Sequence, residues 1–361
     1  MTAGRGAMQS DYMHWFKYQK PVRYNLASSE VPHFRLDRLP LTVGHLDLDG
    51  ASHYRYPPLR QAIADRYGVS PNMVVTANGT SMANFLAMAT LIAPGDEVIF
   101  ETPTYEPMRS AAEFLGADLR PWPRIPGNGF RLDLGQLERI GGPQTKLIVT
   151  TSLHNPSGAL ISEEEVRAIG EIASRCGARV LVDEVYLDSA ATRQPTSALL
   201  GPQFLVTSSL TKVYGLSGLR CGWILAEPEL AERIWRLNDL FGVNNPHPAE
   251  MLSCFAFEYL DEVAAGNAER LAANRALFNR FVASRDDIEC MLAEHGITVF
   301  PRWRGGDAEP LHDVLRSRYD TSIVPGRWFD MRDHFRVGLG GDTGMLEQGL
   351  ARLGSALDEL A

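Results

Sequence analysis

Residues 209–222 read Ser-Leu-Thr-Lys-Val-Tyr-Gly-Leu-Ser-Gly-Leu-Arg-Cys-Gly, directly after an apolar run at 203–207. The run has the composition of a buried strand. The loop after it holds Lys212 between hydroxyls and glycines, with Arg220 eight residues further on. A lysine amine condenses with an aldehyde once it has lost its proton, and an arginine clamps a phosphate in bidentate fashion. The segment therefore suits a ligand with both groups, although such a lysine can also be only a solvated surface charge.

Short apolar runs alternate with helical patterns through the middle of the chain. Further runs rich in β-branched residues lie at 73–76, 97–100, 146–150 and 179–182. Helical spacing occupies 81–92, 106–114 and 163–175, and the stops that follow are Gly95, Gly116 and Gly177. This alternation predicts a parallel sheet wound by right-handed crossovers, in which ligands bind beyond the carboxyl ends of the strands.

Polar residues stand just after three of these runs. Asp183 directly follows the run at 179–182. An isolated carboxylate at the end of a buried strand is costly unless it is paired, and a pyridinium nitrogen is a natural partner. Asn155 opens an Asn-Pro-Ser-Gly turn after the run at 146–150. The segment 78–80, Asn-Gly-Thr, lies at a strand-to-helix junction, where free N–H groups attract phosphate. Taken singly, each has a plainer interpretation as a turn or a helix cap.

In order and spacing these segments resemble the class I and II aminotransferases, from about residue 53 to the C-terminus. The signature of that family has a hydroxyl residue three positions before a Schiff-base lysine and an arginine eight after it, as Ser209 and Arg220 are placed here. The resemblance implies an α/β protein of the PLP-dependent transferase fold type I, with a mostly parallel sheet sandwiched by helices and a smaller α+β domain. It also implies pyridoxal 5'-phosphate (PLP) as the cofactor.

The resemblance assigns a role to each motif residue. Lys212 would carry PLP as a Schiff base and, once released, would remove the α-proton of an amino acid, while Asp183 would keep the pyridine nitrogen protonated. Tyr186 and Asn155 would bond the ring hydroxyl. The phosphate ligands would be Asn78, Gly79, Thr80, Ser209, Thr211 and Arg220. Tyr105 would stack on the ring, with a core aromatic as the alternative, and the substrate ligands would be Arg336, Ser28 and Asn155.

The sequence departs from the family pattern at several positions. His154 stands where a second asparagine is usual, and we expect it to be structural. Arg55 replaces a glycine beside Tyr54. The resemblance implies that Tyr54, with Tyr56 as the second choice, reaches the PLP phosphate of a neighbouring subunit in a homodimer. The segment 11–24 is aromatic and basic. It is expected to be a dimer-clasping arm or to line the substrate pocket, in which case it indicates an apolar or aromatic substrate.

Helical patterns at 228–241 and 248–281, short strands near 298–300, 321–324 and 335–339, and a last helix at 345–360 predict a second domain. We expect an N-terminal segment (1–45) that is part of the small domain, a large PLP-binding domain (46–245) and a small C-terminal domain (246–361).

The composition bears on whether the protein binds nucleic acid, a membrane or a metal. The net charge of −9 disfavours nucleic acid, and the most apolar run is too short for a bilayer, so a cytoplasmic protein is expected. Four scattered cysteines lack metal-ligand spacing, so no metal is expected.

We expect an enzyme that moves an amino group between an L-amino acid and a 2-oxo acid. The same constellation also performs β-elimination, decarboxylation, cyclisation or oxidation in relatives, and these reactions stay open. A different class, a non-catalytic ligand-sensing aminotransferase-like domain, is disfavoured by the intact Lys212 and the acidic charge.

Overall fold

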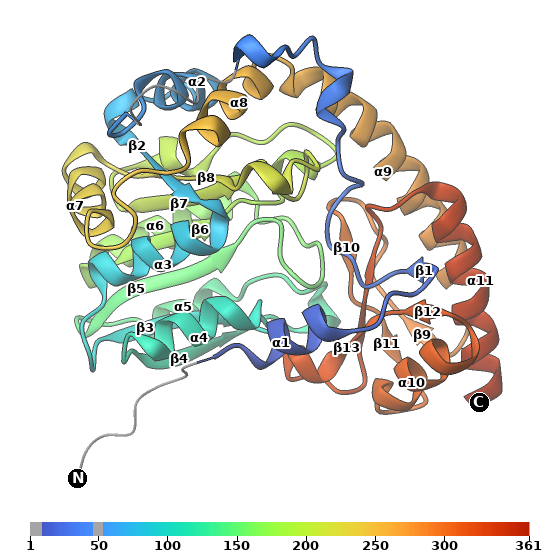
Figure 1. Cartoon of the computed structure of the whole chain (residues 1–361). Coiled ribbons are helices and arrows are strands. Elements are labelled where there is room, and N and C mark those ends of the chain that lie inside the picture. Colours follow the sequence, from blue (N-terminus) through green and yellow to red (C-terminus); the bar gives the residue numbers. More distant parts are fainter. Residues whose placement is uncertain (1–8, 46–52, 361) are drawn as a thin grey trace.

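A seven-stranded sheet forms the centre of the molecule (Figure 1). The structure, a computed structural model, describes residues 9–45 and 53–360. The strand order is β2-β8-β7-β6-β5-β3-β4. The strands are β2 (Val74–Asn78), β3 (Glu97–Thr102), β4 (Asp118–Pro123), β5 (Thr145–Thr151), β6 (Arg179–Asp183), β7 (Phe204–Ser209) and β8 (Cys221–Leu225). The five apolar runs thus form strands, and the mostly parallel α/β architecture is confirmed.

Two strands of the sheet were not expected. β8 pairs antiparallel with β2 and β7, because the chain turns back after β7 through the loop that holds Lys212. The pairs among β3, β4, β5, β6 and β7 are parallel. β4 contains Pro121 and Pro123, which lack the N–H that a strand normally donates. Its place at the edge of the sheet tolerates them, and the same prolines hid the strand from sequence analysis.

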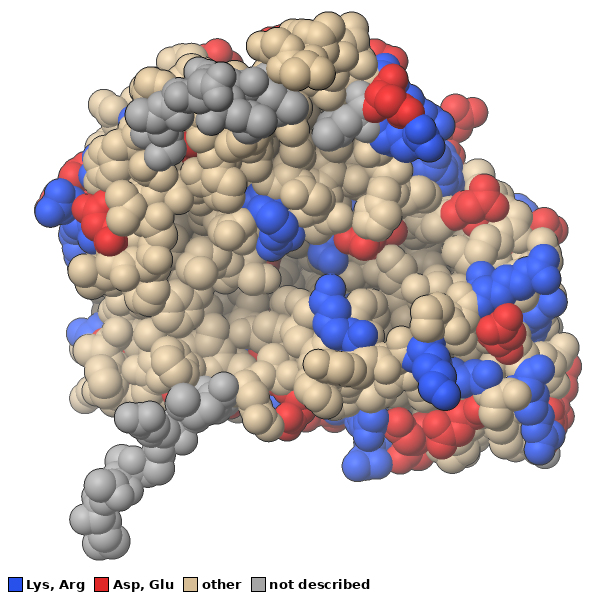
Figure 2. Space-filling model, viewed as in Figure 1, with Lys and Arg blue, Asp and Glu red and all other residues tan. Residues whose placement is uncertain are grey.

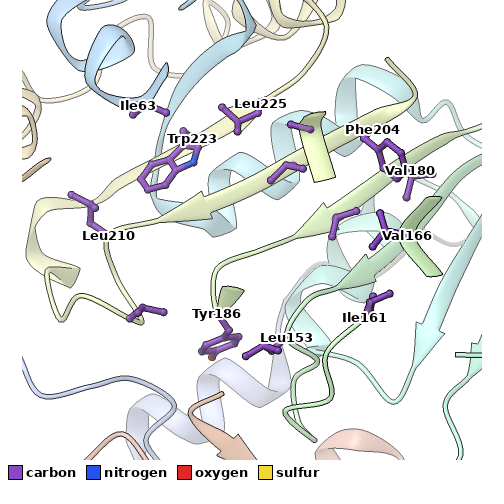
Figure 3. Close-up of a cluster of buried hydrophobic side chains, with 14 of the residues drawn as sticks. Ile63, Leu153, Ile161, Val166, Val180, Tyr186, Phe204, Leu210, Trp223 and Leu225 are labelled. Carbon is purple, nitrogen blue, oxygen red and sulfur yellow. The ribbon is translucent and has the colours of Figure 1, made fainter. Parts of the chain in front are cut away.

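Helices cover both faces of the sheet. One face packs against α3 (Gly79–Leu91), α4 (Glu106–Phe114) and α7 (Pro228–Asn238). The other packs against α2 (Pro57–Tyr67), α5 (Leu134–Ile140), α6 (Glu163–Cys176) and α8 (His247–Phe257). Successive strand residues point to opposite faces, so Val180 and Val182 join one core cluster and Leu181 the other. Figure 3 shows Val180, Phe204 and Trp223 in the cluster on the face that α2, α5, α6 and α8 cover.

A smaller α+β part with its own core lies beside the sheet (Figure 1). Its helices are α9 (Leu260–Ala283), α10 (Ala308–Arg318) and α11 (Thr343–Leu360). Its strands are β9 (Ile288–Glu289), β10 (Thr298–Val299), β11 (Arg302–Trp303), β12 (Thr321–Ser322), β13 (Val324–Pro325) and β14 (Phe335–Gly338). From the other end of the chain, β1 (Tyr24–Asn25) pairs in parallel with β12, and Leu26 joins this core. The exact domain boundaries stay a prediction.

Two of the expected helices in the second half of the chain have different ends in the structure. The expected helix at 248–281 is two helices, α8 and α9, separated at Glu258 and Tyr259. Apolar residues continue through this break, so their spacing does not reveal it. α7 ends at Asn238, three residues before its expected end. In the described part of the chain, no helix combines the length and the apolar character needed to cross a bilayer.

A glycine contact between β8 and the start of α3 gives a test of the fold. A Cβ added to Gly222 would lie 2.7 Å from the Cα of Gly79, where only backbone is available to yield. We expect Gly222→Ala to destabilise the protein by about 2 kcal/mol, because overpacking forces the backbone apart. Urea unfolding measures the change. Gly218→Ala is the control, since a Cβ there meets nothing within 4 Å, and an equal loss in both variants would contradict the account.

Candidate active site

A cavity of about 660 Å³ opens at the carboxyl ends of β5, β6 and β7. It collects residues from distant parts of the chain, and Figure 2 shows that this face is hollowed, with basic side chains on the walls of the hollow. Many of the residues that the family resemblance singled out line it. They are Ser28, Thr80, Tyr105, Asn155, Asp183, Tyr186, Ser209, Thr211, Lys212 and Arg220.

Asp183 lies at the end of β6 with its carboxylate buried. Its Oδ2 accepts a hydrogen bond of 2.8 Å from the Asn84 amide, and its Oδ1 accepts one of 3.0 Å from the Val185 N–H. Burial nevertheless raises the pKa of this carboxyl from 3.8 to about 6, because neutral donors only partly replace water. A cation placed against the carboxylate would restore its charged form, as a protonated pyridine nitrogen would do.

The opposite end of the site is built to hold an anion. α3 begins at Gly79, and Thr80 and Ser81 in its first turn line the cavity, so the free N–H groups of this turn lie beside it. The buried hydroxyl of Thr80 has no hydrogen-bond partner among the described residues. Arg220 closes over Gly79 and donates to the Asn78 carbonyl at 3.2 Å. A Cβ at Gly79 would overlap the guanidinium, so the glycine is what allows this approach. The donors present therefore fit a phosphate group.

Lys212 reaches the cavity from the loop between β7 and β8. Its Nζ lies 3.6 Å from the Oε2 of Glu30, and both side chains are about one-third exposed, at 31% and 28%. The Lys212 carbonyl also accepts a hydrogen bond of 3.0 Å from the Val31 N–H. The lysine is thus placed between Asp183 and the N-terminal segment, with its amine accessible to a ligand.

Arg336 lies in β14 and is fully buried. Its Nη1 donates to Asn155 Oδ1 at 3.0 Å, and its Nη2 donates to the Tyr12 hydroxyl at 3.1 Å and to the Ala27 carbonyl at 3.0 Å. Its Nε has no hydrogen-bond partner in the described part of the chain. The guanidinium is therefore held rigidly and without a carboxylate, which leaves a charge that suits the carboxylate of an amino acid.

The residues around the cavity floor are ordered by buried hydrogen bonds. His154, beside Asn155, bonds the Pro103 carbonyl through Nε2 at 2.8 Å and Ser157 Oγ through Nδ1 at 2.7 Å. Burial lowers its pKa to about 3, so the ring is neutral and works as a structural connector. Burial likewise raises the pKa of Tyr186 to about 12. Tyr105 lines the cavity and also packs edge-on against Tyr12, so it is both a core aromatic and a wall of the site.

Tyr54 does not line the cavity. Its hydroxyl donates to Asp239 at 2.9 Å, and the residue is 44% exposed. Arg55 adopts the left-handed φ of 55° that a glycine would favour, with its guanidinium paired to Glu232. The turn therefore forms without the glycine. The reach of Tyr54 into a second subunit stays a prediction.

Three residues that shape the site were not among the predicted site residues. Tyr12 and Glu30 come from the N-terminal segment, and Asn84 comes from α3. α1 (Asp11–Tyr18) lines the cavity, as one of the two interpretations of this segment required. Asn84 carried a signal, since it is a buried amide inside an otherwise apolar helix. Tyr12 lies in the aromatic segment 11–24, for which lining the substrate pocket was one of the two interpretations, but the sequence does not indicate its contact with Arg336. Glu30 carried no signal, because only tertiary structure brings it to Lys212.

Comparison with known proteins agrees with this geometry. The model of the family "Aminotransferase class I and II" matches residues 47–353. The chain belongs to this family. It is 31% identical to capreomycidine synthase of Streptomyces vinaceus over 93% of this chain and 90% of the other. It is 27% identical to an arginine–pyruvate transaminase of Pseudomonas aeruginosa, over 81% and 79% of the two chains.

Solved structures confirm fold type I. A PLP-dependent aminotransferase from Streptococcus suis superposes with a TM-score of 0.90, at 23% identity and over 98% of this chain and 99% of the other. The PLP-dependent cyclase OrfR superposes with a TM-score of 0.89, at 24% identity and over the whole of both chains. Family and neighbours identify PLP as the cofactor of this chain, and the Asp183 carboxyl, the orphaned Thr80 hydroxyl and the Arg220 guanidinium fit its pyridine nitrogen and phosphate.

The contact between Tyr12 and Arg336 tests the carboxylate site. The Tyr12 hydroxyl accepts from Arg336, so its own proton remains available to donate to a substrate carboxylate. We expect Tyr12→Phe to raise KM for the amino acid about tenfold, as the loss of one hydrogen bond to a charged group does, with kcat nearly unchanged. Tyr18→Phe on the same helix is the matched control, because Tyr18 is 77% exposed. Equal KM values in both variants would contradict this role.

Asp183 is expected to make the stability of the cofactor-free protein depend on pH. Its pKa is raised on folding from 3.8 to about 6, so the folded state binds this proton more tightly and the protein loses stability as the pH rises through that interval. The loss is about 3 kcal/mol once the group is ionised. In Asp183→Asn this loss is absent, so the stability of the variant relative to the wild type should rise from pH 4 to about pH 6 and then level off. Urea unfolding at several pH values measures it, and a difference independent of pH would contradict the assignment.

Proposed function

We propose that this chain is a PLP-dependent aminotransferase that moves an amino group between an L-amino acid and a 2-oxo acid. The observation that carries the proposal is the placement of Lys212 and Asp183 on one cavity. The buried Arg336 lies directly behind two residues of its wall, Asn155 and Tyr12, to which it donates hydrogen bonds. The Lys212 amine suits an aldehyde, the Asp183 carboxylate a pyridine nitrogen, and the Arg336 guanidinium an α-carboxylate. The bound cofactor supplies an electron sink for the pair left at the α-carbon when its proton is removed.

The residues of this chain supply binding, orientation and proton movement. Arg220, Thr80 and the N-terminus of α3 would hold the phosphate, together with Ser209 and Thr211, and Tyr105 would cover the ring. Asn155 would bond the ring hydroxyl with Tyr186, while its Oδ1 also orients Arg336. Arg336 would fix the substrate carboxylate, with Ser28 beside it. Lys212 would take the α-proton and return it to a different carbon.

The proposal includes a homodimer in which Tyr54 completes the site of the partner. Its support is the outward direction of Tyr54, away from the cavity of its own chain. Exposed apolar residues lie on the segment that follows α7, namely Leu240, Phe241 and Val243. An apolar surface of this kind suits contact with a second protein. A cytoplasmic location stays a prediction.

Ring formation or elimination on an amino acid is the second candidate reaction. Its support is that the relative with 31% identity is named a synthase rather than a transaminase. Transamination and these reactions begin with the same removal of the α-proton, so the motif residues alone do not separate them. Their products do, since only transamination leaves the amino group on the cofactor for a 2-oxo acid to accept.

Absorbance spectroscopy tests the proposal with a panel of amino acids followed by 2-oxo acids. The PLP-loaded protein should show a yellow band that an amino-acid donor bleaches and a 2-oxo acid restores. Lys212→Ala should lack both the band and the cycle, whereas Lys146→Ala, an exposed lysine on β5, should keep them. Bleaching without recovery, together with ammonia release, would favour the second candidate. The absence of any band after PLP is added would refute the assignment of the site.

A further inference from the structure

A chain of two hydrogen bonds leads from β7 to the carboxylate of Asp183. Thr207 Oγ1 donates to Asn84 Oδ1 at 2.5 Å, and Asn84 Nδ2 donates to Asp183 Oδ2 at 2.8 Å. All three side chains are buried. Asn84 and Asp183 line the cavity, whereas Thr207 lies behind them and is fully buried. The chain therefore connects the cavity to a residue that no ligand can touch.

These polar residues interrupt an apolar core layer at its edge. Leu181 and Leu205 join the core cluster on the face of the sheet that α3 covers. Two positions further along the same strands, and on the same face, lie the register partners Asp183 and Thr207. α3 meets them with Asn84, although the rest of its buried face is apolar. A buried amide and a buried hydroxyl are costly unless each finds a partner, so their presence here requires an explanation.

The direction of the hydrogen bonds suits an ionised Asp183. An ionised carboxylate only accepts hydrogen bonds, so the amide nitrogen of Asn84 has to face it. The amide oxygen then faces Thr207, whose hydroxyl donates to it. A hydrogen bond to the charged form of a carboxyl group favours that form, and successive bonds in a chain polarise one another. Thr207 therefore strengthens the bond that supports the charge of Asp183.

Asn84 is the one side chain that bonds Asp183 directly in the described part of the chain. The Val185 N–H bonds the other oxygen. Burial has the largest effect on the pKa of Asp183 and raises it, whereas the Asn84 bond lowers it. The charges of Glu101 and Lys212 act on this pKa in opposite directions, Glu101 raising it and Lys212 lowering it. Asn84 thus works against the effect of burial.

Other titratable groups near the carboxylate are neutral or already paired. Burial raises the pKa of the Tyr105 and Tyr186 hydroxyls, so both keep their protons. Arg124 forms a buried ion pair of 2.7 Å with Glu101. α3 and β7, which carry Asn84 and Thr207, contain no charged residue. The two hydrogen bonds therefore act on Asp183 without a competing charge on their own elements.

We propose that Asn84 and Thr207 are positioning residues, which hold the Asp183 carboxylate ionised and directed at the pyridine nitrogen of the cofactor. The inference deepens the proposed function and rests on its use of PLP. Both residues act through Asp183. Without them the carboxylate gives up its charge more readily, and the ring nitrogen loses the partner that keeps it protonated. Substrate binding at Arg336 does not depend on this chain.

The first test uses the cofactor-free protein. Wild-type stability falls as the pH rises from about 4 to about 6, because the folded state holds the Asp183 proton more tightly than the unfolded state does. In Asn84→Leu the charged carboxylate loses a hydrogen bond, so the pH at which the fall stops should rise by about one unit. Thr207→Val should give a smaller rise in the same direction. Urea unfolding between pH 4 and pH 9 measures both.

Two variants control for the loss of a hydroxyl or of packing. Thr207→Ser keeps a hydroxyl at the same position and should restore the wild-type pH profile. Thr90→Val removes a hydroxyl from α3 that donates to the Leu86 carbonyl, and it should leave the profile unchanged. If Asn84→Leu does not fold, the comparison of Thr207→Val with Thr207→Ser decides the question alone.

The second test uses the PLP-loaded protein. Nitrogen-15 NMR of PLP labelled at its ring nitrogen should show a smaller protonated fraction in Asn84→Leu than in the wild type. At saturating amino-acid donor the yellow band should bleach about tenfold more slowly, as the loss of a hydrogen bond to a charged group predicts, with KM nearly unchanged.

Three results would overturn the inference. They are a wild-type pH profile in both Asn84→Leu and Thr207→Val, equal shifts in Thr207→Val and Thr207→Ser, or an unchanged protonated fraction of the ring nitrogen. Each of them leaves the proposed function intact as long as the band still bleaches and recovers. If the wild type forms no band with PLP, the proposed function itself fails, and this inference fails with it.

Discussion

The carboxylate of Asp183 is buried at the carboxyl end of β6 and forms no ion pair within residues 9–45 and 53–360. Burial raises its pKa to about 6, and the molecule tolerates this cost because a cofactor with a protonated nitrogen would remove it. The neighbouring elements are arranged around that requirement. Asn84 from α3 and the Val185 N–H supply neutral hydrogen bonds that orient the two oxygens but do not replace a positive charge. The same helix that supplies Asn84 begins at Gly79, so the two ends of the cofactor site share one rigid element.

A second constraint is the passage of the N-terminal segment between the sheet and the smaller part. Gly338 donates its N–H to the Leu26 carbonyl at 2.7 Å on one side, and Val31 donates to Lys212 on the other. Within this segment the Ala27 carbonyl accepts a hydrogen bond from Arg336, and the Glu30 carboxylate pairs with Lys212. The surroundings of Arg336 and Lys212 are therefore linked through a short stretch of backbone.

Much of this site could be predicted from sequence because its residues follow buried strands. Asp183, Asn155 and Lys212 each come just after an apolar run, and parallel strands bring their carboxyl ends to one edge. The α/β fold followed from the same alternation. The direction of β8 could not be predicted, because it depends on how the loop after β7 turns back. The prolines of β4 concealed an edge strand, and the break between α8 and α9 lies inside continuous apolar spacing.

The individual contacts of the N-terminal segment could not be predicted from sequence for a different reason. Tyr12 lies more than 300 residues from its partner Arg336 along the chain, with a separation of 324. Glu30 meets Lys212 across a loop that has no regular structure. Aromatic and acidic residues in such segments are as common on surfaces as in active sites. The structure therefore adds Tyr12 and Glu30 to the residues that the family resemblance placed at the site.

The central claim is that the amine of Lys212 bonds covalently to PLP. Reduction of the PLP-loaded protein with borohydride, followed by peptide mass mapping, tests it directly because the reduced bond survives digestion. The account predicts that the phosphopyridoxyl mass is found on the peptide that contains Lys212 and on no other lysine peptide. A label on a different lysine, or an unlabelled protein after saturation with PLP, would contradict it.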